Sequence, residues 1–176
     1  MIRILANDGI DADGKMLLEE AEYIVDTDKV AQEDLPKVLP KYDVIIVRSA
    51  TKVRKELIDA CPNLKVIARG GVGMDNIDVD YARSKGIAVI NTPGASTRSV
   101  AELTMAHIYA LSRHIHHAKK ELSSEKGDFK TLKSIYSKGS ELAGKTLGII
   151  GFGRIGQEVA KLAMGANMRI LPYDPF

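Results

Sequence analysis

A glycine-rich segment near residue 150 has the spacing of a loop that binds the pyrophosphate of a dinucleotide. It follows the apolar run at residues 146–150 and precedes a helical pattern at residues 157–164. One glycine allows a tight turn, the second lets phosphate approach the backbone, and the third lets the helix pack closely on the strand. The helix N-terminus then faces the phosphate charge. These three glycines are Gly151, Gly153 and Gly156. In the same turn, we expect Arg154 and Ile155 to contact the pyrophosphate through their backbone.

An acidic residue lies where such sites bind the adenosine ribose. Asp174 ends the next apolar run, residues 168–173, and follows Gly153 by 21 positions. A carboxylate here accepts hydrogen bonds from both ribose hydroxyls and repels the 2′-phosphate of NADP, so the pattern favours NAD. The alternative is that Asp174 only ends a strand. We expect a local bulge at Pro172, because proline lacks the N–H that a strand ladder needs.

Two arginines stand at the ends of other apolar runs. Arg48 ends the run DVIIVR, and Arg69 ends LKVIAR just before a glycine-rich loop. Ligands of parallel α/β sheets bind at the carboxyl ends of strands, so the two arginines could converge on one anion. Arginine suits phosphate because its planar fork donates bidentate, charge-assisted hydrogen bonds. The alternative is two solvated side chains at strand ends. The nearby Asp75, Asn76 and Asp78 are interpreted as turn and helix-capping residues.

The elements that must position these residues follow a β–α rhythm. Helical stretches separate short runs rich in β-branched residues at 2–6, 22–27, 43–48, 64–69 and 87–92. Nearly all-apolar strands are buried on both faces, which predicts a parallel α/β sheet. The rhythm changes at Pro93, so we predict domains at residues 1–93 and 94–176. The second is incomplete, because a full dinucleotide-binding fold needs two βαβαβ halves.

A long helix and a polar arm are predicted between the boundary and the glycine-rich segment. Ser99-x-x-Glu102 matches a capping box, and apolar residues then recur every three or four positions to about residue 122. Residues 123–141 are polar and basic, and are predicted to be a loop or an arm. This arm is too polar to fold on itself, so we expect it and the helix to pack on a partner subunit. The prediction is a homodimer or a higher homo-oligomer.

Composition excludes several classes of function. The chain has 176 residues, 45% of them hydrophobic, and a net charge of +2, which is typical of a soluble globular protein without a basic face for nucleic acid. Its apolar runs are far shorter than the roughly 20 residues of a membrane span. No targeting segment is visible, so we expect a cytoplasmic protein. The single cysteine, Cys61, is interpreted as structural.

The four histidines do not predict a metal site. They are His107, His114, His116 and His117. The spacing of His114 and His117 could hold a metal on one helix face. No cysteine or clustered carboxylate completes a ligand set, so no metal is expected.

Several linked segments resemble the D-2-hydroxyacid dehydrogenases over nearly the whole chain. These are RSATKV (48–53), RGGVGMDNID (69–78) and NTPGASTRSVAELT (91–104), followed by LAGKTLGIIGFGRIG and YDP. The resemblance implies an α/β protein with a flavodoxin-like, parallel-sheet substrate domain, followed by the first part of a Rossmann-type dinucleotide-binding domain. It also implies NAD-dependent oxidation of a CH–OH group.

The resemblance assigns roles to particular residues. Backbone N–H groups around Val72 and Gly73 would bind the substrate carboxylate, while Arg48, with Ser49 beside it, and Arg69 would approach a substrate phosphate. Val72 would also lie near the nicotinamide, and Thr104 would face the cofactor from the long helix.

Within the family, the resemblance implies oxidation of 3-phospho-D-glycerate to 3-phosphohydroxypyruvate, the first step of serine biosynthesis. Two alternatives stay open: a dehydrogenase for an unphosphorylated acid such as glyoxylate or lactate, and an NAD(H)-sensing protein similar to the corepressors of this superfamily. The family's catalytic arginine, glutamate and histidine lie after YDP and have no matching positions here. We therefore expect the N-terminal half of such an enzyme, without catalytic residues and without turnover by itself.

Overall fold

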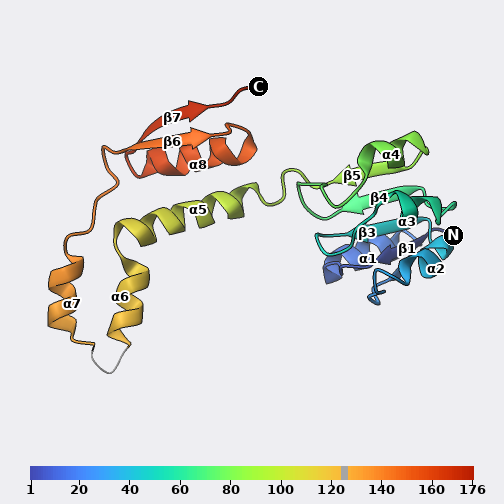
Figure 1. Ribbon diagram of the computed structural model, residues 1–176, viewed down its shortest axis with the longest axis horizontal. Helices are drawn as coiled ribbons and strands as arrows, with labels where there is room; N and C mark the ends of the chain where they lie inside the picture. Colours follow the sequence, from blue (N-terminus) through green and yellow to red (C-terminus); the bar gives the residue numbers. More distant parts are fainter. Residues whose placement is uncertain (124–126) are drawn as a thin grey trace. The chain divides into compact units, whose positions relative to one another are not determined.

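The computed structural model describes residues 1–123 and 127–176. The chain divides into two units, Met1–Ala95 and Ser96–Phe176, which are described separately (Figure 1). This division falls two residues after the boundary expected from the sequence. Both units combine parallel strands with helices, and the predicted α/β class is confirmed.

The first unit is built on a five-stranded parallel sheet. Its strands are β1 (Arg3–Ala6), β2 (Ile24–Asp26), β3 (Val44–Val47), β4 (Val66–Arg69) and β5 (Ala88–Asn91). Their order is β2-β1-β3-β4-β5, which is the flavodoxin-like order. The alternation of apolar runs and helical stretches therefore predicted this sheet correctly, and each strand lies inside its predicted run.

Short helices connect these strands. They are α1 (Ala12–Glu20), α2 (Leu35–Val38), the 3-10 helix η1 (Leu39–Lys41), α3 (Lys55–Asp59) and α4 (Val79–Ser84). The core of the unit lies against the central strands, where Leu5, Ile45 and Ile67 have almost no exposed surface. Cys61 is also buried there, and burial raises the pKa of its thiol to about 11. This agrees with a structural role for Cys61.

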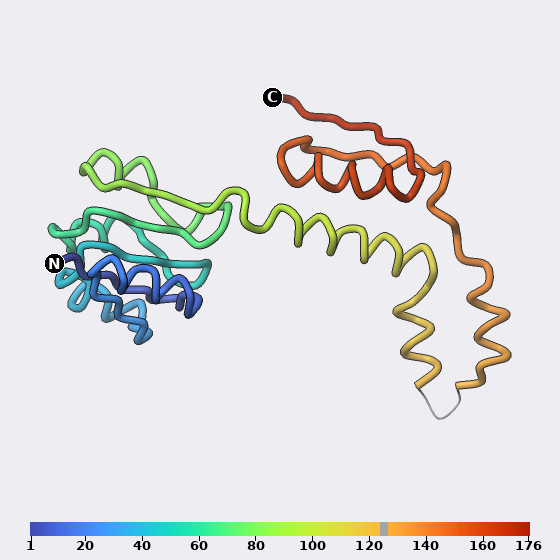
Figure 2. Tube along the Cα trace, turned by 180° about the vertical axis from the view of Figure 1, so that it is seen from behind, coloured from blue at the N-terminus to red at the C-terminus, as the bar shows by residue number. Residues whose placement is uncertain are grey.

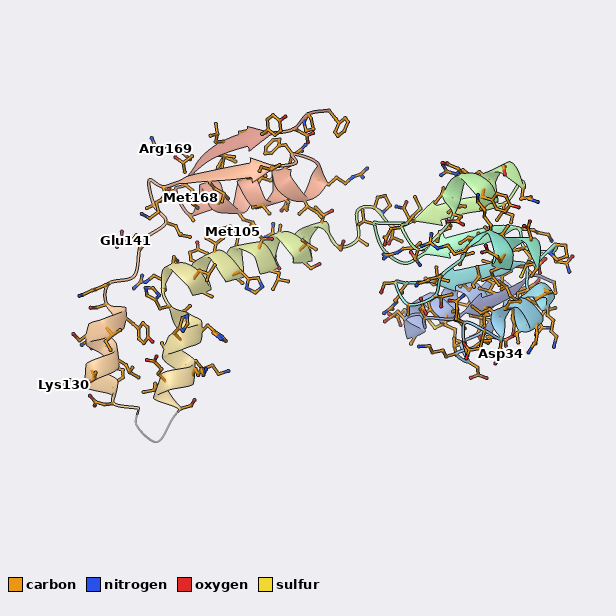
Figure 3. All side chains as sticks on the ribbon, in the orientation of Figure 1. Asp34, Met105, Lys130, Glu141, Met168 and Arg169 are labelled. Atoms are coloured by element: carbon orange, nitrogen blue, oxygen red, sulfur yellow. The ribbon has the colours of Figure 1, made fainter. Side chains whose placement is uncertain are left out.

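Among its described residues, the second unit contains a βαβ element and three further helices. Its elements are α5 (Thr97–Ser112), α6 (Ile115–Leu122), α7 (Phe129–Tyr136), β6 (Thr146–Ile150), α8 (Arg154–Gly165) and β7 (Arg169–Tyr173). The parallel strands β6 and β7 are connected by α8, as expected for the first part of a Rossmann-type domain. A small core joins α5 to this element, with Met105 of α5 and Met168 before β7 among its members (Figure 3).

The single long helix predicted to reach about residue 122 is wrong. The helix α5 ends at Ser112, and α6 begins only at Ile115. Between them His114 adopts a left-handed conformation with φ of 56°. A right-handed helix needs φ near −60°, so His114 interrupts the helix despite the continuing apolar spacing.

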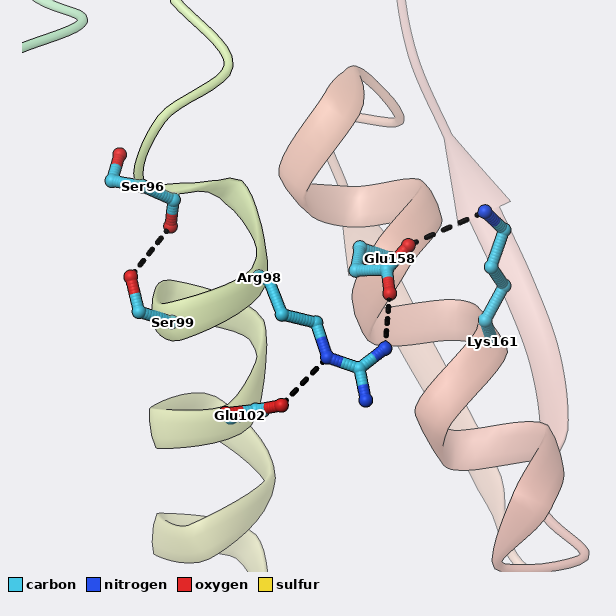
Figure 4. Close-up of polar contacts among 6 residues, drawn as sticks. All are labelled: Ser96, Arg98, Ser99, Glu102, Glu158 and Lys161. Carbon is cyan, nitrogen blue, oxygen red and sulfur yellow. Dashed lines mark hydrogen bonds and ion pairs between the residues drawn. The ribbon is translucent and has the colours of Figure 1, made fainter.

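The predicted capping box is also absent. Ser96, rather than Ser99, precedes the first residue of α5, and its side chain makes no capping bond. The Ser99 hydroxyl donates to the Ser96 carbonyl oxygen at 3.1 Å, and Glu102 accepts from the Arg98 Nε atom at 2.6 Å (Figure 4). Arg98 also donates to Glu158 of α8 at 2.6 Å, so Glu102 belongs to a link between α5 and α8.

Part of the predicted polar arm is a helix. Within residues 123–141, α7 begins after Asp128, whose carboxylate accepts from the backbone N–H groups of Lys130 and Thr131. Apolar Phe129, Leu132 and Tyr136 recur on one face of this helix, which lies beside α6 in an antiparallel hairpin (Figure 2). Residues 124–126 of the arm lie outside the described residues.

Pro172 occupies its strand without the expected bulge. The register is continuous, with Ile149 opposite Pro172 and Ile150 opposite Tyr173. The Arg169 N–H and the Tyr173 carbonyl both bond to the backbone on the β6 side. Alternate residues of a strand direct their backbone groups to opposite sides. The nitrogen of Pro172 therefore faces away from β6, and its missing N–H removes no hydrogen bond between β6 and β7.

Candidate functional site

The carboxyl edge of the first sheet brings the two predicted arginines to neighbouring positions. Arg69 ends β4 and pairs in register with Val47, so Arg48 is the next residue on the adjacent strand. A β-carbon on Gly70 would lie 3.7 Å from Cγ of Arg48, which shows how closely the loop after β4 passes that side chain. Arg48 and Ser49 are exposed, whereas Arg69 is partly buried.

The guanidinium of Arg69 lies on its own loop. Its Nη1 atom donates to the Gly70 carbonyl oxygen at 3.3 Å, and a β-carbon on Gly71 would overlap the guanidinium. Gly71 also has φ of 155°, a conformation that favours glycine, whereas the overlapping guanidinium is the end of a flexible side chain that can move. The Nε atom of Arg69 is buried and has no hydrogen-bond partner within the described chain.

The glycine-rich loop after β4 is fastened to the end of β5. The Val72 carbonyl accepts from the Asn91 side chain at 2.7 Å, and the Gly71 carbonyl accepts from Thr92 N–H at 3.0 Å. Val72 and Gly73 remain exposed, with 40% of the Val72 surface accessible. Among the described residues their N–H groups have no acceptor, so they could donate to a carboxylate.

Asp8, Thr51 and Asn76 hold this edge of the sheet together, which the sequence did not predict. Burial raises the pKa of the Asp8 carboxyl, but hydrogen bonds from the Thr51 hydroxyl and from the Thr51 and Arg48 amides outweigh it, so the pKa lies below its usual value. Asn76 donates to the backbone of the loop after β3. The only sequence signal for these contacts was that each polar residue lies in a segment that follows a strand.

The capping interpretation of Asp78 is wrong. Asp78 precedes α4 but makes no side-chain capping bond. Its carboxylate instead accepts from Nη1 of Arg54 at 2.9 Å and from the Lys55 N–H at 3.0 Å. The Arg54 hydrogen bond holds the pKa of the Asp78 carboxyl below its usual value. Asp78 therefore ties the segment after β3 to the segment after β4.

In the second unit the fingerprint glycines form a strand–turn–helix. Gly151 follows β6 with φ of 91°, a conformation that favours glycine. A β-carbon on Gly156 would overlap the Gly151 carbonyl oxygen, so α8 packs on the turn more closely than any other residue type allows. Gly153 caps α8, and a β-carbon there would meet nothing within 4 Å. The space beside Gly153 and the α8 N-terminus fits a pyrophosphate.

Asp174 directs its carboxylate toward this turn. Its Oδ2 atom accepts from the Phe152 N–H at 2.6 Å, and its Oδ1 atom accepts from the Phe176 N–H at 3.2 Å. A carboxylate has about four acceptor positions, so further donors can bind. Arg154 and Ile155 form the first turn of α8 next to it.

A cavity of about 410 Å³ lies between α5, β6 and α8 and joins Thr104 to the fingerprint. Its lining is mainly apolar and consists of Thr104, Ile108, Leu147, Gly148, Ile149, Ile150, Gly151, Ile155, Gly156 and Val159. Thr104 donates its hydroxyl to the Val100 carbonyl oxygen at 2.8 Å, which orients the side chain along α5. Val72 belongs to the first unit and is not part of this cavity.

The histidines gather at the α5–α6 break. His107, His114, His116 and His117 line one surface hollow with Leu111 and Ile115. In residues 1–123 and 127–176, no group of three or more histidine, cysteine or acidic side chains is arranged to hold a metal ion. No described helix is long and apolar enough to cross a membrane.

The sequence also matches the model of a known protein family across most of its length. The profile of the D-isomer specific 2-hydroxyacid dehydrogenase catalytic domain matches residues 4–164. The chain belongs to this family, as the resemblance in its motifs predicted.

Two curated relatives and one solved structure illustrate the similarity. The chain is 49% identical over 174 residues to a hydroxypyruvate reductase from Thermotoga maritima, covering 98% of this chain and 55% of the relative. It is 45% identical over 176 residues to a D-3-phosphoglycerate dehydrogenase from Methanocaldococcus jannaschii, covering 100% of this chain and 33% of the relative. An NAD⁺-bound 3-phosphoglycerate dehydrogenase from Entamoeba histolytica superposes with a TM-score of 0.77 at 32% identity, over 99% of this chain and 54% of the other. The chain thus spans about half or less of each.

Proposed function

We propose that this chain supplies the substrate-binding edge and the pyrophosphate-binding turn of an NAD-dependent dehydrogenase that oxidises 3-phospho-D-glycerate to 3-phosphohydroxypyruvate. One observation carries the choice of substrate: Arg69 ends β4, and Arg48 lies one position beyond its register partner Val47 at the same carboxyl edge of the sheet. Two arginines at one edge suit a phosphate, which offers more charge and more acceptors than a hydroxyl group. The likeness to dehydrogenases named for 3-phosphoglycerate supports the same choice.

The remaining substrate contacts follow from the loop after β4. The exposed N–H groups of Val72 and Gly73 would bind the carboxylate shared by all 2-hydroxy acids, while Ser49 and the two arginines would face the phosphate. The carboxylate contacts would serve any 2-hydroxy acid, whereas the phosphate contacts would serve only a phosphorylated substrate. Variants of the arginines should therefore change the choice between substrates.

The fingerprint turn fits NAD. Gly151, Gly153 and Gly156 and the backbone of Arg154 and Ile155 would hold the pyrophosphate, and Asp174 would accept hydrogen bonds from the ribose hydroxyls. When bound, NAD supplies the hydride acceptor. Val72 is a proposed contact on the nicotinamide side, and Thr104 is a proposed cofactor contact from α5. The NAD⁺-bound relative supports this cofactor.

The decisive experiment compares two substrates in the full-length enzyme. Arg48→Ala or Arg69→Ala should raise KM for 3-phospho-D-glycerate roughly ten- to a hundredfold, on the energy scale of one charge-assisted hydrogen bond. Turnover of D-glycerate should change much less. Arg83→Ala is the matched control, because Arg83 is an exposed arginine on α4. Equal losses for both substrates would mean that the arginines serve the shared carboxylate or the fold.

A second candidate is a dehydrogenase for an unphosphorylated acid such as hydroxypyruvate. The folded-back guanidinium of Arg69 favours it, because its Nη1 atom already donates to Gly70 and Arg69 is partly buried, whereas Arg48 is exposed. The similarity to a hydroxypyruvate reductase supports it as well. In the same comparison, an unsubstituted enzyme that prefers D-glycerate, the reduced form of hydroxypyruvate, with no effect of either arginine variant, would favour this candidate.

We also propose that the protein is a homodimer or a higher homo-oligomer. The α6–α7 hairpin exposes an apolar hollow of about 290 Å³ lined by Ala118, Leu122, Phe129, Leu132, Lys133, Tyr136 and Ser137. Phe129 of the hairpin is 67% exposed, and Leu111 near the end of α5 is 76% exposed. Exposed apolar surface of this kind commonly marks a subunit contact. Sedimentation at tens of micromolar tests it, and Phe129→Lys should shift an assembly toward monomer.

A further inference from the structure

Both ends of the segment from Arg48 to Thr51 are held by side chains from neighbouring strands. Asp8, after β1, accepts at Oδ2 from the N–H groups of Arg48 (2.7 Å) and Thr51 (3.0 Å), and at Oδ1 from the Thr51 hydroxyl (2.7 Å). Asn76, after the glycine-rich loop, donates from Nδ2 to the carbonyls of Arg48 (2.8 Å) and Thr51 (2.7 Å). We call Asp8 and Asn76 the loop clamp.

While its Nδ2 atom makes these two contacts, the Oδ1 atom of Asn76 is left without a hydrogen bond in the described part of the chain. Its side chain is buried, with 6% of its surface exposed. The two neighbouring carbonyls require that Nδ2 face them, and the Oδ1 atom then has no partner in the described part of the chain. Buried polar atoms without partners are uncommon and point to a role beyond packing. The contact that Asn76 gains joins two loops of the proposed substrate site.

The clamp leaves the tip of the segment free. Between the two held residues, Ser49 and Ala50 are exposed, and so is the side chain of Arg48. The backbone of Arg48 is thus fixed at its N–H and at its carbonyl while its guanidinium remains available. A binding group fixed in this way loses less conformational freedom when a ligand arrives.

We propose that Asn76 is a positioning residue of the substrate site. It fixes the segment 48–51 against the loop after β4, so that the arginine side and the carboxylate-binding side have one geometry before substrate binds. The inference rests on the proposed function for the identity of the ligand. The link between the two loops does not depend on it.

The test replaces the donor without changing the size of the side chain. Asn76→Asp removes both N–H groups and places a carboxylate against two carbonyls. Amide hydrogen exchange at Arg48 and Thr51 should become about tenfold faster or more, and the Kd for 3-phospho-D-glycerate should rise about tenfold, which is the scale of one net hydrogen bond. Asn63→Asp is the matched control, because Nδ2 of Asn63 donates to the Pro40 carbonyl at 3.1 Å in an exposed contact outside the clamp.

Two further variants separate positioning from general stability. Asn76→Ser keeps one hydrogen-bond donor on a smaller side chain, and it takes the place of Asn76→Asp in the test if that variant does not fold. Its effects on amide exchange and on the Kd should be intermediate between those of the unsubstituted protein and those expected for Asn76→Asp. Ile67→Val weakens the core of the same sheet without touching the clamp. If Ile67→Val raises the Kd as much as Asn76→Ser at a similar loss of stability, the positioning role is overturned.

The exchange measurement distinguishes this inference from the proposed substrate. Unchanged exchange at Arg48 and Thr51 in both Asn76 variants would overturn the inference whatever binds. If the unsubstituted protein binds neither 3-phospho-D-glycerate nor D-glycerate, the proposed function fails, and faster exchange in Asn76→Asp still supports the clamp.

Discussion

Both units are built from β–α–β elements, but only the first has central strands with a neighbouring strand on each side. In the first unit β1, β3 and β4 each have a strand on both sides, and Ile45 and Ile67 are fully buried. In the second unit β6 and β7 pair only with each other among the described residues, and Ile150 is 90% exposed. Apolar runs in both units formed strands. Burial, in contrast, depends on how many strands and helices are present to cover them.

The largest expected effect tests this difference in burial directly. Ile67→Ala removes a buried side chain from β4 and should lower the free energy of unfolding of the first unit by about 2 to 5 kcal/mol. Ile150→Ala removes an exposed side chain from β6 and should change stability by less than about 0.5 kcal/mol. Urea unfolding monitored separately in each unit provides the measurement. A large loss from Ile150→Ala would show that β6 is covered in solution.

The second prediction concerns the acid of the second unit. In a protein with a complete nucleotide-binding sheet, Asp174→Ala should weaken NAD binding by about 1.5 to 3 kcal/mol, the range for hydrogen bonds to charged groups. Loss of the charge should also improve tolerance of NADP. Calorimetry with both cofactors measures this, and Asp80→Ala, an exposed acid of the first unit, is the control. If the affinity for NAD and the preference for NAD over NADP do not change, the role of Asp174 is only structural, through hydrogen bonds such as the one from the Phe152 N–H.

A third, smaller effect is expected at the fingerprint turn. Gly156→Ala forces a β-carbon onto the Gly151 carbonyl oxygen and should destabilise the β6–α8 contact by about 1 to 3 kcal/mol. Gly148→Ala is the control, because its β-carbon would meet nothing within 4 Å. Hydrogen exchange of β6 amides should accelerate only in the Gly156 variant. Equal behaviour of the two variants would contradict the close packing described for α8.

The smallest effect is a pH dependence confined to the first unit. The pKa of Asp8 is lowered on folding from its usual 3.8, so its contribution to stability is present above that value and is lost as pH falls through the lower, folded pKa. Lys29 adds attraction for the charged form. Exchange at Arg48 and Thr51 should accelerate as pH falls through this range, after correction for intrinsic rates. In Asp8→Asn that extra acceleration should be absent.

The sequence predicted the elements of the first unit well because its signals were local and mutually consistent. Each apolar run is short and separated from the next by a helical stretch, and parallel pairing of such runs has few alternatives. The same holds for the fingerprint, where the strand, the glycines and the helix are contiguous. The placement of Arg48 and Arg69 at one edge of the sheet was also predictable, because Arg69 ends β4 and Arg48 directly follows β3. Their convergence on one anion stays a prediction.

Other features depended on contacts that local patterns do not contain. His114 breaks the long helix although the apolar spacing continues through it, and Glu102 pairs with Arg98, which also pairs with Glu158, instead of capping α5. Asn76 lies in a turn, as expected, but its side-chain contacts could not be predicted because their partners lie more than twenty positions away in the chain. The helix α7 could have been found from Asp128 and the apolar spacing after it, but the surrounding polar residues hid that signal.

The open pair of strands in the second unit has a consequence for solubility. The outer edges of β6 and β7 present unpaired backbone groups in the described chain, and Ile150, Leu171 and Tyr173 expose apolar surface beside them. Edges of this kind recruit further strands from other molecules. A chain with this edge uncovered would therefore aggregate through β6 or β7, independently of any ordered assembly at the α6–α7 hairpin. A charged residue at position 150 should suppress aggregation through the strand edges and leave assembly at the α6–α7 hairpin intact.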